Sequence, residues 1–169
     1  KRALVLGAGP IGLLATLTLR VLGWEVTTAA RKPTGSQKAK IAESSGAKYH
    51  SVVERPLLEL ARGGSSFDFI FEATGSAQAA FDSIHCLAIN GVLCLTSVTG
   101  GGQSKTIPID KINCDLVLGN KLIFGTVNAG RVDFTDGLAY LEKIEKAYPK
   151  ILQRLLTGRV SFANVDNLF

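Results

Sequence analysis

Three glycines near the start of the chain have the spacing that a phosphate-binding turn requires. They lie in the segment Gly7-Ala8-Gly9-Pro10-Ile11-Gly12. Gly7 permits a tight turn, Gly9 has no Cβ and lets a pyrophosphate approach the backbone, and Gly12 allows a helix to pack closely on a strand. Pro10 suits the first turn of a helix, whose free N–H groups and dipole attract an anion. The segment predicts a pyrophosphate site.

The neighbouring residues supply the strand and the helix that such a site needs. An apolar run over residues 3–6 precedes the glycines, and an amphipathic pattern over residues 10–22 follows them, with Gly23 as its stop signal. A second strand is expected over residues 24–30. This order of strand, turn, helix and strand favours a dinucleotide site over a purely structural glycine turn.

Strands and helices alternate along the rest of the chain. Further strands are expected over residues 47–51, 67–72, 91–95 and 121–127, and further helices over residues 36–45, 56–62, 76–87, 110–118 and 134–156. Gly63-Gly64 should end the third helix, and Pro149 should break the last one. Residues 99–104 are the most flexible part by composition. The alternation predicts an α/β fold: a doubly wound, mostly parallel six-stranded Rossmann sheet in the order 3-2-1-4-5-6. Its ligand should lie between the first and fourth strands.

Length and composition exclude several classes of protein. The 169 residues suit one domain, and no apolar run reaches the roughly 20 residues that a membrane helix needs. Lys1-Arg2 and the apolar run after them are not expected to form a signal peptide, because the glycine turn interrupts the run. The net charge is only +5 and aromatic residues are 7% of the chain, which argues against a nucleic-acid partner.

The cysteines and histidines do not suggest a metal site. Cys86, Cys94 and Cys114 lack the spacing of metal ligands and lie among apolar residues. They are therefore expected to be buried free thiols of a cytoplasmic protein. His50 and His85 are far apart in the sequence and have no ligand partners nearby, so no metal-binding residue is expected in this chain.

The end of the second strand favours NADP over NAD. NAD sites place an acidic residue there to bind the ribose 2′-OH, whereas NADP sites have a small residue and nearby Arg or Lys. Here the strand ends at Ala30, and Arg31 and Lys32 follow. Arg31 can bind a 2′-phosphate through two hydrogen bonds, and Lys38 and Lys40 add to the local field. The alternative is an ordinary solvated turn, and use of NAD as well remains open.

Two more strand ends carry small and polar residues. Glu72-Ala73-Thr74-Gly75 closes the fourth strand, where small residues would let the ribose and nicotinamide approach. Glu72 is interpreted as a structural or ribose-side residue and not as a general base. Asn128 follows the sixth strand, in Gly125-Thr126-Val127-Asn128-Ala129-Gly130, and is either a hydrogen-bonding partner of a carboxamide or substrate hydroxyl or a plain turn residue.

Several segments together resemble a known family. GAGPIG, EATG, NGVLCL, FGTVNAG and the tail AYPKILQRLLTGRVSF are similar to the nucleotide-binding domain of the medium-chain dehydrogenases/reductases, and most similar to its glucose dehydrogenases. The resemblance covers nearly all of the chain. Ala30 and Lys32 depart from it, because these enzymes often have Asn and Arg there.

The resemblance implies that residues 1–169 are a single NAD(P)-binding domain of a longer, homo-oligomeric two-domain enzyme. The other domain would hold a zinc ion that polarises the C1 hydroxyl of a sugar, while hydride passes to the nicotinamide, so this chain alone would bind NADP without catalysing turnover. By position, Ala30, Arg31 and Lys32 would bind the 2′-phosphate. The residues implied for the nicotinamide half are Ala73, Thr74, Gly75, Thr96, Ser97, Val98, Thr126, Val127 and Asn128.

Two other interpretations remain open at this stage. The chain could be the cofactor domain of another medium-chain enzyme, such as an alcohol or threonine dehydrogenase. It could also be a regulatory domain that senses NAD(H) without chemistry. The glycine-rich residues 99–104 and the Asn128 turn argue against a sensor, because a sensor does not need to shape a nicotinamide pocket.

Overall fold

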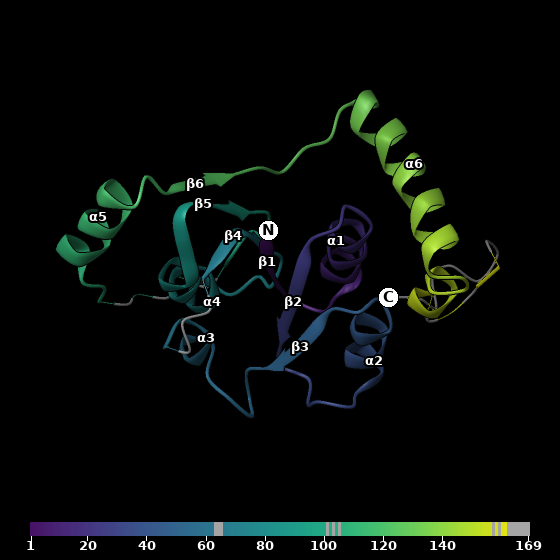
Figure 1. Ribbon diagram of the computed structural model, residues 1–169, viewed down its shortest axis with the longest axis horizontal. Helices are drawn as coiled ribbons and strands as arrows, with labels where there is room; N and C mark the ends of the chain where they lie inside the picture. Colours follow the sequence, from purple (N-terminus) through teal and green to yellow (C-terminus); the bar gives the residue numbers. More distant parts are fainter. Residues whose placement is uncertain are drawn as a thin grey trace.

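The computed structural model contains a six-stranded sheet in the order β3-β2-β1-β4-β5-β6, and each neighbouring pair is parallel (Figure 1). The predicted fold class and strand order are confirmed, and the sheet is parallel throughout. The strands are β1 Arg2–Leu6, β2 Glu25–Ala30, β3 Lys48–Ser51, β4 Phe67–Glu72, β5 Leu87–Leu95 and β6 Leu122–Gly125. The structure describes residues 1–62, 66–100, 102, 104, 106–156, 158, 160 and 161.

The helices lie between the strands as the alternation predicts. They are α1 Pro10–Val21, α2 Gln37–Ser44, α3 Leu58–Arg62, α4 Ala77–Ser83, α5 Ile109–Leu118 and α6 Arg131–Ala147, with short 3₁₀ helices η1 Ile84–Cys86 and η2 Leu152–Leu155. Tyr148 leaves the helical conformation directly before Pro149, because the residue before a proline disfavours it. The predicted break therefore separates α6 from η2.

Alternating residues of β1 place the core on both faces of the sheet. Ala3 and Val5 pack in one cluster with Leu19 of α1, whereas Leu4 and Leu6 pack in another with Ile70. A third cluster joins α1, α2 and α6, and Figure 1 shows α6 beside α1, away from α3 and α4. Because helices cover both faces, β1 is almost entirely buried, as the continuous apolar run predicts.

One boundary differs clearly from the prediction. The fourth helix was expected to run to Leu87 and the fifth strand to begin at Gly91, but the helix ends in η1, and β5 already begins at Leu87. The main chain supplies the reason, because Leu87 pairs with Phe67 and the register then shifts before Phe69. Asn90 takes a positive φ of 59° within this irregularity. Pairing with β4 has thus overridden the local helical preference.

Some expectations fall on residues outside the described part of the chain. These are the Gly63-Gly64 stop signal, Gly101 and Gln103 of the glycine-rich stretch, and Thr157, Arg159 and Phe162 of the tail. Among the described residues, no helix is both long and apolar enough to cross a membrane.

Large apolar side chains are exposed on both α5 and α6. Phe134 and Leu138 of α6 are 69% and 70% exposed, and Val117 and Leu118 of α5 are 65% and 77% exposed. In Figure 1, α5 and β6 lie at one end of the sheet, and β6 is its edge strand. Where exposed apolar side chains form a contiguous patch, the patch is typical of a region that contacts another chain or domain.

The three cysteines differ in their environments, which corrects one prediction. Cys86 and Cys94 are buried as expected, but Cys114 on α5 is exposed. Burial is the main cause that raises the pKa of the Cys86 thiol to about 11, and Asp82 nearby adds to the rise. Burial also raises the pKa of Cys94.

We expect only Cys114 to react with iodoacetamide in the folded chain, because the thiolate is the reactive form and the other two thiols are both buried and hard to ionise. Peptide mass spectrometry after labelling at about pH 8, a condition chosen near the ordinary thiol pKa, measures this. Labelling in denaturant is the control and should modify all three. Rapid labelling of Cys86 in the folded chain would contradict the buried core described above.

Candidate functional site

The turn between β1 and α1 has the geometry that its glycines predict. Gly7 has a φ of 105°, and a Cβ there would lie 2.6 Å from the carbonyl oxygen of Ala73. A Cβ on Gly12 would overlap the carbonyl oxygen of Gly7 and lie 2.8 Å from its carbon. A Cβ on Gly9 would have no neighbour within 4 Å, so this position is open to an approaching ligand.

The N-terminus of α1 directly follows this turn. Pro10 occupies the start of the helix, and Gly9 is the N-cap residue, which has no side chain to cap it. The N–H groups of the first turn therefore have no capping side chain and point out of the helix end, where the dipole favours an anion. Thr16 holds the helix in place, because its hydroxyl contacts that of Thr28 on β2 at 2.8 Å.

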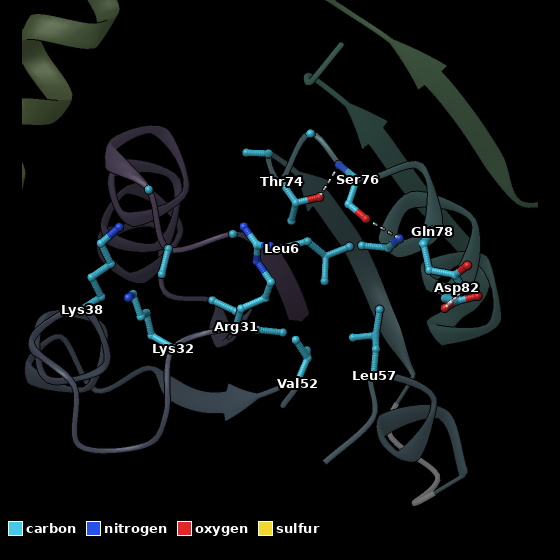
Figure 2. A pocket seen from close by; sticks show the side chains of 18 residues that line it. Leu6, Arg31, Lys32, Lys38, Val52, Leu57, Thr74, Ser76, Gln78 and Asp82 are labelled. Atoms are coloured by element: carbon cyan, nitrogen blue, oxygen red, sulfur yellow. Dashed lines mark hydrogen bonds between the residues drawn. The ribbon is translucent and has the colours of Figure 1, made fainter. Parts of the chain in front are cut away.

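A first cavity of about 600 Å³ opens beside the turn, at the carboxyl ends of β1, β2 and β4. The glycine turn lines one part of it, and the residues after β2 line another. The side of α4 closes the far end, with Gln78 and Asp82. Figure 2 shows Arg31, Lys32 and Lys38 on one side of this cavity and Gln78 and Asp82 on the other.

We call Arg31, Lys32 and Lys38 the basic group. Arg31 and Lys32 follow β2, whereas Lys38 comes from the first turn of α2. Ala30 ends β2 without a carboxylate. Among the described residues that line this cavity, the acidic one is Asp82, at the opposite end, so the basic end of the cavity attracts an anionic group.

Two side chains hold the loop that carries Arg31 and Lys32. The Tyr49 hydroxyl donates to the carbonyl oxygen of Lys32 at 3.0 Å. The Glu54 carboxylate accepts from the backbone N–H of Thr34 at 2.9 Å and from its hydroxyl at 2.6 Å. These two Thr34 bonds lower the pKa of Glu54. The loop therefore has anchors on β3 and after it, which limit its freedom near the cavity.

Glu72 is a buried carboxylate at the end of β4, only 1% exposed. It accepts from the backbone N–H of Thr74 at 2.7 Å, from the Thr74 hydroxyl at 2.6 Å and from the Ser97 hydroxyl. The Thr74 hydroxyl in turn accepts the N–H of Ser76, and the Ser97 hydroxyl accepts that of Gly75. Glu72 thus ties the β4–α4 turn to the end of β5, as its predicted structural role requires.

A second cavity of about 300 Å³ lies at the ends of β5 and β6. Its lining comes from two predicted segments, Thr96-Ser97-Val98 and Thr126-Val127, with Leu95 and Gly125 beside them. Ser97 therefore lines this second cavity while it also binds Glu72 behind the first one.

The residues that the resemblance assigns together to the nicotinamide half do not all line one cavity. Ala73, Thr74 and Gly75 line the first cavity together with the basic group, and not the second cavity with Thr96–Val98. Parallel register explains this, because the turn after β4 lies directly beside Gly7, which follows β1. Asn128 lines neither cavity and is exposed.

The sequence interpretation missed some of the lining. Val52, Leu57, Ser76, Gln78 and Asp82 all line the first cavity, and Lys38 does so while Lys40 does not. Gln78 and Asp82 are four residues apart, a spacing that puts them on one side of a helix. The sequence shows this spacing, but it does not show which side of the helix faces the cavity.

The described residues of the first cavity suit the phosphates of a dinucleotide, and no described cluster suits a zinc ion. The open Gly9 position, the helix N-terminus and the basic group suit its phosphates. Within the described part of the chain, no three His, Cys, Asp or Glu side chains are grouped closely enough to hold a metal ion. His50 instead contacts the carbonyl oxygen of Arg55 at 2.9 Å.

Comparison with known families decides the identity of the fold. A family model described as "Glucose dehydrogenase C-terminus" matches residues 1–169. The chain belongs to this family. Glucose 1-dehydrogenase of Methanocella arvoryzae is 44% identical over 165 residues, which are 98% of this chain and 46% of the relative. Glucose 1-dehydrogenase 1 of Caldivirga maquilingensis is 37% identical over 169 residues, 100% of this chain and 46% of the relative.

A solved structure extends the likeness to three dimensions. Glucose dehydrogenase of Haloferax mediterranei, in complex with NADP, Zn and gluconolactone, matches with a TM-score of 0.90 and 28% identity, covering 100% of this chain and 47% of that one. The chain therefore spans about half the length of the glucose dehydrogenases it matches. These relatives are oxidoreductases, and the matched family is described as their C-terminal part.

Proposed function

We propose that this chain is the NADP-binding domain of a two-domain sugar dehydrogenase that oxidises the C1 hydroxyl of glucose or a related aldose. The observation that carries the proposal is the first cavity, which combines a glycine turn with a basic group and lacks an acidic residue at the end of β2. The named relatives are glucose dehydrogenases, and one of them binds NADP. The family match supports this assignment over an NAD(H) sensor.

The cofactor's phosphates have a natural place in this cavity. Its pyrophosphate would lie at Gly7–Gly9, against the N-terminus of α1. Its 2′-phosphate would bind Arg31 through two hydrogen bonds, with Lys32 and Lys38 as added positive charges. Ala30 leaves room for the phosphate, where a carboxylate would repel it.

The nicotinamide half would lie in the second cavity. Thr96–Val98 and Thr126–Val127 come from neighbouring strand ends and would contact the nicotinamide and its ribose. Ala73, Thr74 and Gly75 would contact the adenosine side, since they share the first cavity with the basic group. Asn128 would meet the carboxamide or the substrate only in the assembled enzyme, because it is exposed in this chain.

The other half of the enzyme would supply the remaining chemistry. Zinc is part of the Haloferax mediterranei complex, and the described residues of this chain offer no cluster that would hold it. We therefore assign this chain binding and orientation of the cofactor but no part in metal chemistry. The exposed apolar side chains of α5, β6 and α6 support a homo-oligomeric enzyme. Its cytoplasmic location stays a prediction.

Calorimetric titration of the chain with NADP and with NAD, each at low and high salt, tests the proposal. We expect NADP to bind about ten- to a hundredfold more tightly than NAD at low salt, because a phosphate held by charged donors gains about 1.5–3 kcal/mol. The difference should shrink at high salt, because the basic group is open to solvent. Equal affinities would show that the basic group is an ordinary solvated turn.

Substitution of Ala30 by Asp should reverse the preference. The new carboxylate would repel the 2′-phosphate and accept hydrogen bonds from the 2′-OH of NAD. We expect NADP affinity to fall about a hundredfold and NAD affinity to rise, measured in the same titrations, since the loss of a charged hydrogen bond and the added repulsion act together.

A second variant, Arg31→Ala, tests whether the position of Arg31 matters for NADP binding. Its matched control is Lys40→Ala, which removes an exposed charge from α2 that does not line the cavity. It should lower NADP affinity far less than Arg31→Ala does. Similar losses in the two variants would indicate that only the general positive field matters, and not the position of Arg31.

A further inference from the structure

The end of the first cavity opposite the basic group carries an acid and an amide. Gln78 and Asp82 lie four residues apart on the same side of α4, and both line the cavity (Figure 2). The side-chain amide of Gln78 donates to the Asp82 carboxylate, which is half-buried. The negative charge of Asp82 repels a phosphate, so this end of the cavity does not suit the phosphates of the proposed cofactor.

The connectivity of a dinucleotide decides which group reaches this end. The adenosine ribose carries the 2′-phosphate on C2′, the pyrophosphate on C5′ and the base on C1′. With the phosphates at the glycine turn and at the basic group, the base must enter the rest of the same cavity. That part has the apolar side chains of Val52 and Leu57 as well as Gln78 and Asp82, a lining that suits a flat ring with a polar edge.

We propose that Asp82 accepts a hydrogen bond from the 6-amino group of adenine and makes the site selective for a 6-amino purine. The inference rests on the proposed function. An ionised carboxylate only accepts hydrogen bonds, and it has about four lone-pair positions, so it can serve Gln78 and the base together. Gln78 holds the carboxylate toward the cavity and keeps a second N–H, a donor suited to the N1 acceptor of adenine.

A 6-oxo purine presents the opposite pattern on the same edge. Its O6 is an acceptor and would face the negative charge of Asp82, whereas its N1 carries a hydrogen and would face the N–H of Gln78. Both contacts become unfavourable without any change in the size of the ring. A site that relies on such hydrogen bonds rejects the wrong partner because its polar groups are left unpaired.

Titration with NADP and with its hypoxanthine counterpart, nicotinamide hypoxanthine dinucleotide phosphate, tests the inference on the unmodified chain. We expect the hypoxanthine form to bind at least about tenfold more weakly, as for the loss of a hydrogen bond to a charged group. In Asp82→Asn the ratio should approach one, because the amide can turn its N–H toward O6. Equal affinities in the unmodified chain, or an unchanged ratio in Asp82→Asn, would overturn the assignment.

The ratio separates recognition of the base from a merely structural effect. Both ligands share every other group, so loss of folded protein lowers both apparent affinities alike and leaves their ratio unchanged. Asp136→Asn on α6 removes the same charge from an exposed residue outside the cavity lining and should keep the ratio of the unmodified chain. NADP binding without preference for the base would reject the role of Asp82 alone. Failure of both ligands to bind would reject the proposed function and this inference with it.

Discussion

Replacement of Glu72 by alanine should lower the free energy of unfolding by about 3 kcal/mol, because a buried donor left without its acceptor costs about 1–3 kcal/mol. The carboxylate is 1% exposed and accepts from the Thr74 N–H, the Thr74 hydroxyl and the Ser97 hydroxyl. Its removal strips these donors of a partner and removes the side-chain link between the β4–α4 turn and Ser97 at the end of β5. Urea denaturation monitored by circular dichroism measures the change.

The isosteric variant Glu72→Gln should be milder, with a loss of about 1 kcal/mol, because its oxygen still accepts while its amide meets a hydroxyl that must reorient. Glu142→Gln is the matched control, since Glu142 is exposed and pairs with Lys146 on the same helix. It should leave the urea midpoint unchanged within experimental error. A Glu72→Ala loss as small as that of the control would show that the hydroxyls readily find other partners.

The Glu72 variants should also weaken NADP binding. The turn that Glu72 holds lines the first cavity with Thr74 and Gly75, and Ser97 lines the second. A looser turn must be ordered again when the cofactor binds, which costs free energy for each side chain that is immobilised.

Replacement of Gly12 by alanine should destabilise the chain by about 3 kcal/mol, at the upper end of the cost of overpacking. The added Cβ would overlap the carbonyl oxygen of Gly7, which belongs to the backbone of the glycine turn and cannot rotate away. Helix α1 would have to move off β1, and this movement would also displace the anion site at its N-terminus. Thermal and urea denaturation, followed by NADP titration, measure the two effects.

Gly137→Ala is a control that makes the same substitution but is expected to change the stability in the opposite direction. Gly137 lies inside α6, and a Cβ there would have no neighbour within 4 Å. Alanine is the better helix former, so this variant should be more stable by about 0.5–1 kcal/mol. Destabilisation by both variants would contradict the view that the Gly7 carbonyl is the cause at position 12.

The sequence by itself determined most of the fold. The apolar run of β1, the glycine turn and the amphipathic α1 are local patterns, and Pro10 and Gly23 mark the limits of the helix in the chain itself. Alternation of strands and helices then leaves few topologies, because parallel connections are right-handed and short. The strand order and the absence of an acidic residue at the end of β2 were therefore readable without coordinates.

The tertiary structure decided which residues share a cavity. Leu87 to Asn90 became strand because β4 lies beside them, and Ala73 to Gly75 joined the basic group because the end of β4 lies against Gly7. Gln78 and Asp82 reached the same cavity through the packing of α4, and Cys114 on α5 is exposed although it was expected to be buried. Local patterns specify the type of an element, whereas its neighbours depend on contacts between residues far apart in the chain, which only the folded molecule brings together.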